Sequence, residues 1–500
     1  MVMGKYYITT PIYYPNARPH IGTAYTTILA DYLARVRRSL GDDVFFLTGT
    51  DEHGMKLSKA AKEKGLTPQQ FVDQLADEFK VIWKELDISY DRFIRTTDED
   101  HLKTVQDIIL RCKENGDIYK GYYEGLYCVD CEQYYTEKDL VDGKCPIHGK
   151  PVERLSMESY FFSLSSYQDK LLKFYEENPE FLPDRFATEV INRVKGGLRD
   201  ISISRPKRYL DWGVEFPGDP EHVVYVWFDA LTNYLTGVGY STDKKMFGKY
   251  WPADVHLIGK DIIWFHCVIW PAMLMSAGLP LPKRVAANGF LTVNGQKISK
   301  SLGNVIDPVE IKNRFGTSDI LRYYLLREIP FGSDGDFSLE SVRERYNNEL
   351  VNEFGNLVNR VLIMFGKYGR EGSGVDEGLF EEFEGIVDRY LRHLEDLKLK
   401  QAVDTLWQTV SLANSYINRK EPWKLAKDNP EEAGRVVRTL AEYLVFLDAY
   451  LYPLLPEGTT RLAEHLGFDH PPKITELKPF GENLQPERIR EGGLILYKRV

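Results

Sequence analysis

Hydrophobic and polar positions alternate between strand-like and helix-like spacing over the first 115 residues. Short runs of β-branched and aromatic residues have the spacing of buried strands, and between them apolar side chains recur at helical spacing. The pattern predicts strands at 5–14, 43–48 and 91–96, and helices at 20–40, 67–86 and 98–115. Strand, helix, strand, helix is typical of a doubly wound, Rossmann-like α/β fold with a parallel sheet.

This alternation stops at residue 117 and returns after residue 222, which predicts an inserted module rich in aromatic residues, turns and cysteine. It resumes with a strand, a helix, a strand and a helix at 223–228, 229–235, 254–259 and 262–277. Beyond residue 340 the pattern is one of long amphipathic helices, followed by a proline-rich tail that we expect to pack back as irregular chain. We therefore expect these parts: 1–116, first half of the nucleotide-binding fold; 117–222, the insertion; 223–292, its second half; 293–342, a lysine-containing loop and linking segment; 343–500, an α-helical domain with its tail.

Net charge and hydropathy narrow the possible partners and location of the protein. A net charge of −10 argues against a protein that coats nucleic acid non-specifically, but it leaves room for a folded RNA held by local basic patches. The sequence contains no apolar stretch of 18 residues, so we expect no membrane partner. The first residues lack the apolar core of a secretory signal, and we expect a cytoplasmic protein.

Cysteine spacing predicts a metal site inside the insertion. Cys128-x-x-Cys131 is followed, after thirteen residues, by Cys145-x-x-His148. Three thiolates and one imidazole in paired knuckles match the ligands of a tetrahedral structural Zn²⁺, one per chain, and the alternative is a set of unpaired buried cysteines. Because all four ligands come from the protein, such a metal would fold the insertion and leave no position for a substrate.

Two further segments have the chemistry to bind phosphate. Pro19-His20-Ile21-Gly22-Thr23 opens the first predicted helix, whose N-terminal N–H groups suit an anion, although His20 alone could be a structural cap. Lys297-Ile298-Ser299-Lys300-Ser301 combines two cations with two hydroxyls next to Gly303, and alone it could be a solvated surface loop.

The two segments together resemble the paired signatures of class I aminoacyl-tRNA synthetases, and further motifs make the chain similar to the methionyl-tRNA synthetase family over residues 4–470. The chain departs from the family pattern at Thr23, where histidine is usual, and at Ile298, where methionine is usual. The resemblance implies ATP-dependent aminoacylation of tRNA(Met) for translation initiation and elongation. L-methionine and Mg²⁺-bound ATP would give methionyl-adenylate and pyrophosphate, and methionine would then pass to the tRNA 3′ end.

The resemblance also implies roles for individual residues, all read from matching motifs. Catalysis would rest on His20, Lys297 and Lys300. ATP would be bound by His20, Gly22, Thr23, Asp261, Lys297, Ser299 and Lys300. Methionine would be bound by Ile12, Tyr14, Asp51, Trp227, Ala230, Tyr234, Ile262 and His266, with Asp51 on the ammonium group. Each aromatic residue among these, taken alone, could be ordinary core.

A last candidate site lies in the helical part. Asn352, Asn356 and Arg360 are spaced four apart, which puts them on one helical face opposite apolar residues, and Trp423 follows a helix break. Amide, guanidinium and indole groups read and stack unpaired bases, but a solvated polar face with a docked tryptophan fits equally well. The resemblance puts anticodon contacts at these four positions.

Other functions fit the sequence less well. A cysteinyl-tRNA synthetase would use zinc on its substrate, whereas here the knuckle is remote in sequence from the predicted pocket. Isoleucine, valine and leucine enzymes need a larger editing insertion. A catalytically silent tRNA-binding module would not need the lysine loop, and a small nucleotidyltransferase would lack the helical domain. Oligomeric state, and a separate tRNA-binding or dimerisation subunit, stay open.

Overall fold

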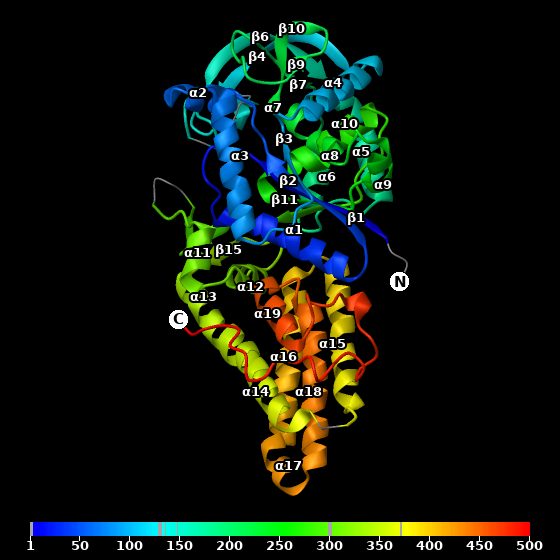
Figure 1. Ribbon diagram of the computed structural model, residues 1–500. Coiled ribbons are helices and arrows are strands. Elements are labelled where there is room, and N and C mark those ends of the chain that lie inside the picture. Colours follow the sequence, from blue (N-terminus) through cyan, green and yellow to red (C-terminus); the bar gives the residue numbers. More distant parts are fainter. Residues whose placement is uncertain (1–3, 129–132, 136, 148, 299–302, 371–372) are drawn as a thin grey trace.

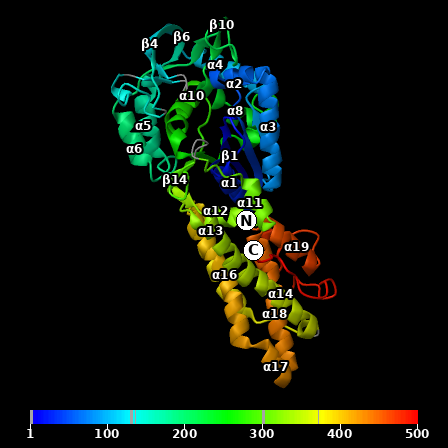
Figure 2. The same ribbon diagram turned by 90° about the vertical axis from the view of Figure 1, so that its left-hand side faces the viewer.

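The computed structural model describes residues 4–500 except 129–132, 136, 148, 299–302 and 371–372. Figure 1 shows an α/β part at one end and long helices at the other, with α1 running between them across the base of the sheet. The turned view of Figure 2 has the same division, and α17 lies at the tip of the helical end in both. The predicted combination of a Rossmann-like domain and a C-terminal helical region is confirmed.

The α/β part is built on a parallel sheet with strand order β12-β11-β1-β2-β3. Its strands are β1 (Lys5–Tyr13), β2 (Asp43–Thr50), β3 (Arg92–Arg95), β11 (Val255–Gly259) and β12 (Val285–Asn288). Its helices are α1 (Ile21–Ser39), α2 (Met55–Glu63), α3 (Pro68–Glu85), α4 (Glu99–Glu114), α7 (Val226–Ala230), α8 (Asn233–Gly237), α9 (Lys244–Tyr250) and α10 (Trp270–Ser276). All but α2 and α9 fall on or close to predicted patterns.

The strand order changes direction beside β1. The chain runs from β1 to β2 and β3 on one side, and β11 and β12 add on the other, with Ile8 paired to Val255 and to Phe46. In open α/β sheets, ligands bind outside the carboxyl ends of the strands at such a switch point. The ends of β1, β2, β11 and β12 are therefore the expected position of a site.

The region after α4 is antiparallel. One sheet has the order β5-β4-β6-β7 and another the order β8-β10-β9. Their strands are β4 (Ile118–Cys128), β5 (Gln133–Tyr135), β6 (Glu153–Phe162), β7 (Ile201–Ser202), β8 (Ser204–Pro206), β9 (Glu215–Phe216) and β10 (Asp219–Val224), and the helices α5 (Gln168–Glu177) and α6 (Ala187–Lys195) accompany them.

The predicted strand at 223–228 is wrong. Val223 and Val224 end β10, which pairs antiparallel with β8 and takes no part in the parallel sheet, and Val226 begins α7. The run predicts a strand because its residues are β-branched or aromatic. Val224 and Phe228 are buried in the same apolar cluster, and burial alone does not distinguish a strand from a short helix.

A small sheet of order β14-β13-β15 leads from the α/β part to the helices. It contains β13 (Leu291–Val293), β14 (Gln296–Lys297) and β15 (Gly335–Phe337). The helices that follow β14 are α11 (Pro308–Phe315), α12 (Asp319–Glu328), α13 (Leu339–Arg345), α14 (Asn356–Met364), α15 (Glu377–Glu395), α16 (Leu399–Lys420), α17 (Pro422–Asp428), α18 (Pro430–Leu451) and α19 (Pro456–Leu466). The tail after α19 is mostly irregular and packs back, with Leu496 and Tyr497 buried, as predicted.

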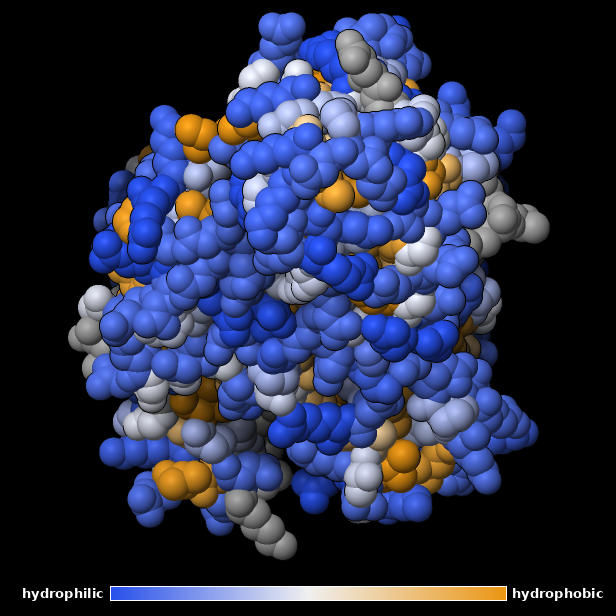
Figure 3. Space-filling model, turned by 90° about the horizontal axis from the view of Figure 1, so that it is seen from below, coloured by the Kyte–Doolittle hydropathy of each residue, from blue (hydrophilic) through white to orange (hydrophobic). Residues whose placement is uncertain are grey.

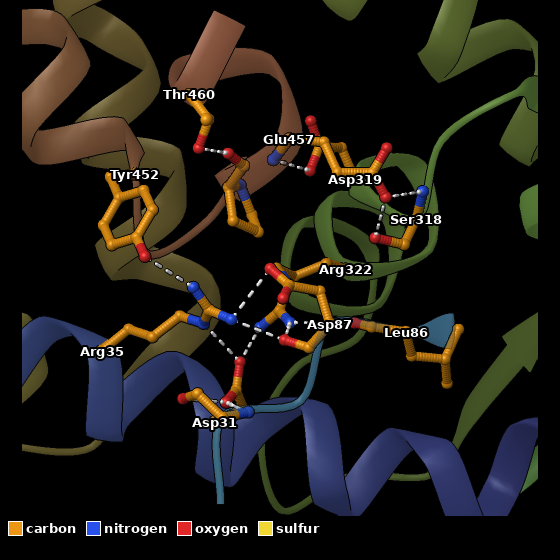
Figure 4. A network of polar contacts seen from close by, with 12 residues as sticks. Asp31, Arg35, Leu86, Asp87, Ser318, Asp319, Arg322, Tyr452, Glu457 and Thr460 are labelled. Carbon is orange, nitrogen blue, oxygen red and sulfur yellow. Dashed lines mark hydrogen bonds and ion pairs between the residues drawn. The ribbon is translucent and has the colours of Figure 1, made fainter. Parts of the chain in front are cut away.

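The two ends meet through buried charges (Figure 4). Asp31 on α1 contacts Arg35 at 2.8 Å and Arg322 on α12 at 2.6 Å, and all three side chains are buried. Next to them, Asp319 accepts the backbone N–H groups of Glu457 at 3.1 Å and Gly458 at 2.8 Å, so it caps α19 from another helix. The junction thus consists of directional contacts as well as apolar packing.

The surface of the helical end is mostly hydrophilic, with only small, separate apolar spots in the view from below (Figure 3). Among the described residues, no helix combines the length and the apolar character that crossing a membrane requires.

Candidate functional site

A cavity of about 850 Å³ opens at the carboxyl ends of β1, β2, β11 and β12. It contains the residues predicted for ATP and methionine that the structure describes. These are Ile12, Tyr14, His20, Gly22, Thr23, Asp51, Trp227, Ala230, Tyr234, Asp261, Ile262, His266 and Lys297. Ser299 and Lys300 lie outside the described residues. Segments more than 280 residues apart in sequence therefore converge on one site.

Another cavity, of about 640 Å³, lies at the opposite ends of the strands, where Tyr6, Asp254 and Arg284 meet α15. None of the predicted site residues lines it. Since ligands of open α/β sheets bind at the carboxyl ends, the cavity at the switch point is the candidate site.

His20 is the N-cap of α1, and its Nδ1 accepts the N–H of Gly22 at 3.0 Å. The cap interpretation therefore holds, and it leaves the proton of a neutral ring on Nε2 as a donor. A Cβ at Gly22 would lie 2.9 Å from Cε1 of His20 and 3.7 Å from Cδ1 of Ile298, so only glycine lets the ring fold over the helix start. Both predicted phosphate segments thus meet at the positive end of α1.

The side-chain pocket is neutral. His266 is buried, and burial lowers its pKa to about 4, so the ring is uncharged at pH 7. Its Nδ1 donates to the carbonyl of Ile262 at 3.0 Å, which leaves Nε2 to accept the hydroxyl of Tyr234 at 2.7 Å. Trp227 stacks on Phe265 with 3.6 Å between ring centroids. Aromatic faces and uncharged polar groups suit an apolar, polarisable side chain such as a thioether.

Charged groups line the rest of the cavity. Asp51 is buried at the end of β2, and its backbone N–H donates to Tyr13 at 2.9 Å. Burial raises the pKa of Asp261, while the charges of Lys260 and Lys297 act in the opposite direction. A Cβ at Gly259 would lie 2.6 Å from Oδ1 of Asp261, so the glycine makes room for this carboxylate.

Sequence reasoning missed several lining residues. Asn288 ends β12 and accepts the hydroxyl of Thr26 at 3.0 Å, and Asp334 pairs with Lys260 at 2.6 Å beside the cavity. Lys56 enters from α2, which was not predicted. Asn288 could have been found, because a polar residue directly after a buried parallel strand lies at the ligand-binding edge.

The predicted metal ligands fall only partly within the described residues, because Cys131 and His148 lie outside them. Cys128 and Cys145 are both buried and share one small cluster with Tyr135, partly covered by Leu140. No group of three or more potential ligands occurs in the part of the chain that the structure describes. The structure therefore brings two of the predicted thiols into one cluster and leaves the metal untested.

The predicted polar stripe lies on the outside of the helical end. Asn352 and Asn356 are exposed and Arg360 is half-buried, in a helix that changes from π-type to α-type at Asn356. The opposite face is buried; it consists of Phe354, Leu357, Val358, Val361 and Phe365. Arg360 lies over the ring of Trp423, 5.7 Å from its centroid, although the two residues are on different helices. Trp423 is 38% exposed, so it is not a core residue.

Comparisons with known proteins cover nearly the whole chain. The family model "tRNA synthetases class I (M)" matches residues 6–154 and 138–362, and the model of the anticodon binding domain of methionyl tRNA ligase matches residues 367–486. The methionine–tRNA ligase of Caldanaerobacter subterraneus is 48% identical over 99% of this chain and 79% of its own length. That of Thermotoga maritima is 48% identical over 99% of this chain and 80% of its own length.

Solved structures agree. Methionyl-tRNA synthetase of Mycobacterium tuberculosis in complex with methionyl-adenylate superimposes with a TM-score of 0.92 at 42% identity, covering 99% of this chain and all of that chain. Its apo form superimposes with a TM-score of 0.86.

Proposed function

The chain belongs to the methionyl-tRNA synthetase family, and from that premise we propose that it activates L-methionine with ATP and transfers the methionyl group to tRNA(Met). The observation that carries this proposal is the meeting of both signature segments and a neutral aromatic pocket in one cavity. A small-molecule adenylating enzyme would need the cavity alone, whereas the anticodon-type helical region supports a tRNA substrate.

In the first step, a carboxylate oxygen of methionine attacks the α-phosphorus of ATP, and the bond to pyrophosphate breaks. Asp51 binds the ammonium group at one wall, while Trp227, Tyr234 and His266 enclose the side chain. The attacking carboxylate is already ionised, so catalysis consists of positioning and charge stabilisation and needs no protein nucleophile. Mg²⁺ enters with ATP and offsets the charge of the phosphates.

His20, Lys297 and Lys300 stabilise the charge that builds up on the phosphates. The Nε2–H of His20 and the N-terminus of α1 serve the α-phosphate, and the two lysines serve the departing pyrophosphate. Gly22, Thr23 and Ser299 complete the phosphate contacts, and Asp261 accepts the ribose hydroxyls. In the second step, a ribose hydroxyl of the tRNA 3′ end attacks the carbonyl carbon of methionyl-adenylate, and AMP leaves.

The insertion holds one structural Zn²⁺ in this proposal. Cys128 and Cys145, which share one buried cluster, are the described half of a ligand set completed by Cys131 and His148. Thiolates and a neutral imidazole are the donors that Zn²⁺ prefers, and the bound metal would supply folding energy to a module with little core of its own.

The anticodon of tRNA(Met) binds at the tip of the helical end. Asn352, Asn356 and Arg360 read base edges, and the exposed ring of Trp423 stacks on an unpaired base. The pairing of Arg360 with Trp423 supports this assignment, since it holds a guanidinium and an indole in fixed positions near the tip.

The parts defined from sequence carry these roles: 1–116 and 223–292 the catalytic fold, 117–222 the zinc-containing insertion, 293–342 the lysine loop and link, 343–500 the anticodon domain. A cytoplasmic location and a separate tRNA-binding or dimerisation subunit stay predictions.

Amino-acid-dependent exchange of pyrophosphate into ATP, measured with each of the twenty amino acids, tests the activation step. We expect exchange with methionine and at least a hundredfold less with leucine or isoleucine, because neither offers a flexible thioether. Charging of tRNA(Met) transcripts tests the second step. Preferred exchange with another amino acid, or none with methionine, would refute the proposal.

A further inference from the structure

The residues after Asp51 are anchored by buried polar contacts. Glu52 is fully buried, and its carboxylate accepts Nε and Nη2 of Arg95 at 2.7 and 2.9 Å. Its carbonyl accepts the indole N–H of Trp212 at 2.6 Å. This strand end is therefore held in place by residues that do not line the cavity.

His53 is the second anchor of the same segment. Its Nδ1 lies 2.6 Å from Oδ2 of Asp229, and the other oxygen of Asp229 lies 2.7 Å from Nε2 of His101 on α4. All three side chains are buried, Asp229 and His101 completely. One carboxylate on α7 thus joins the β2–α2 segment to α4, across sequence separations of 176 and 128 residues.

Asp229 is ionised in this arrangement. Burial by itself would raise its pKa, but the charges and hydrogen bonds of His53 and His101 outweigh burial, and its pKa lies below the usual value. A carboxylate only accepts hydrogen bonds, so His53 donates its Nδ1–H and His101 its Nε2–H. The orientation of both rings follows from the position of one side chain.

Asp229 stands between two walls of the amino-acid pocket. Its neighbours in α7, Trp227 and Ala230, line the cavity, and so does Asp51, two residues before His53. His53, Asp229 and His101 do not line the cavity themselves, so they do not touch the substrate. Their contacts set the distance between the group that binds the substrate ammonium and the wall that encloses its side chain.

We propose that Asp229, bridged by His53 and His101, is a positioning residue that determines the affinity for the amino-acid substrate. This inference rests on the proposed function, since it assigns the cavity to methionine. A buried ion cluster could instead serve stability alone. The two roles predict different effects. Loss of a positioning residue weakens binding of the amino acid and leaves ATP binding, across the cavity at α1, unaffected. Loss of a residue that only stabilises the fold lowers the Tm, or weakens the binding of both substrates equally.

Matched variants separate the two roles. His53→Asn keeps a donor near the position of Nδ1, and His101→Gln keeps one near Nε2, whereas His53→Leu and His101→Leu remove the donors. In pyrophosphate exchange we expect the leucine variants, and Asp229→Asn, to raise the KM for methionine ten- to a hundredfold. A loss of this size is expected when a binding group is displaced by about 1 Å. The KM for ATP should change less than twofold, and the amide variants should recover most of the methionine affinity.

Titration calorimetry with methionine alone, in the absence of ATP, gives the same comparison at equilibrium. Equal changes in the KM for methionine and ATP, or amide variants as weak as the leucine variants, would overturn the inference. So would unchanged kinetics accompanied only by a lower Tm. Wild-type exchange with methionine is the reference in each case. If the wild type shows no methionine-dependent exchange, the proposed function is refuted. If the wild type is active and the variants keep its KM for methionine, only the positioning role is refuted.

Discussion

Replacement of Trp423 by alanine separates the two steps of the reaction. Trp423 lies on α17, which is at the tip of the helical end (Figures 1 and 2), and it does not line the cavity, so activation of methionine should not depend on it. A ring stacked on an unpaired base contributes about 1–3 kcal/mol. At 1.4 kcal/mol per tenfold, the kcat/KM for tRNA(Met) should fall by between about fivefold and somewhat over a hundredfold. Pyrophosphate exchange should stay within twofold of wild type.

Because Trp423 is partly exposed, its replacement by alanine should cost little free energy of unfolding. A fully buried aromatic residue costs about 3–5 kcal/mol when truncated. Trp423 is 38% exposed, and its main charged neighbour is Arg360 at 5.7 Å, a contact of about 0.5–1 kcal/mol, so we expect a smaller loss.

Trp423→Phe keeps a stacking face and should recover part of the tRNA activity. Arg389→Ala, on α15, is a control that removes another exposed side chain of the same helical region. Equal losses in exchange and charging for Trp423→Ala would show that the ring only stabilises the fold, and would refute the anticodon assignment.

Three further predictions concern the lysine loop, the zinc and the junction. Lys300→Ala should lower kcat for pyrophosphate exchange a hundredfold or more and leave the Kd for methionine nearly unchanged, because its charge acts on the transition state; near-normal exchange would exclude the loop from the mechanism. Metal analysis of chelator-free protein should find one Zn²⁺ per chain, and Cys145→Ser should lose it and lower tRNA charging more than activation; protein without zinc would contradict the site. Burial and the charge of Glu457 raise the pKa of Asp319 from 3.8 to about 6, so its stabilising contribution is present below pH 3.8 and lost as the pH rises through 6. The free energy of unfolding should therefore fall by at most about 3 kcal/mol between pH 4 and 7. Urea unfolding of Asp319→Asn should not show this fall. If the variant loses as much stability as the wild type over this pH range, other groups cause the loss.

Local patterns were sufficient for the elements that dominate the fold. The strand predicted at 5–14 is β1 at Lys5–Tyr13, whose continuous buried run is typical of a central strand in a parallel sheet. The helix predicted at 20–40 is α1 at Ile21–Ser39, which is long and mostly buried. The pattern failed at 223–228, where antiparallel pairing and the short helix α7 share one apolar run. The helix α2 was missed because only Leu57 and Ala61 are buried, too few for a periodic signal.

The lining residues of the cavity could be predicted from the sequence where they belong to a recognisable phosphate-binding motif. His20 and Lys297 were found because phosphate binding needs a helix start and cations in recognisable order. The contacts behind the cavity could not be found in this way. His53, His101 and Asp229 come from three separate segments, and each alone is an ordinary buried polar residue. Their partnership depends on tertiary geometry, which leaves no local signal in the sequence.

The junction in Figure 4 explains how one tRNA could engage both ends of the molecule. The helix α1 is capped by His20 at the cavity and, further along, carries Asp31, which contacts Arg322 on α12 at 2.6 Å. Buried charge pairs stabilise a fold less than apolar residues of the same volume, but loss of either partner leaves an uncompensated charge. Stability alone is therefore a poor explanation for this contact. An apolar junction would tolerate sliding between α1 and α12, whereas a buried ion pair is satisfied in one geometry. The ion pair therefore fixes α12, which belongs to the helical end, relative to α1, whose N-terminus lies at the cavity, and a tRNA bound at both ends of the molecule would need such a fixed junction.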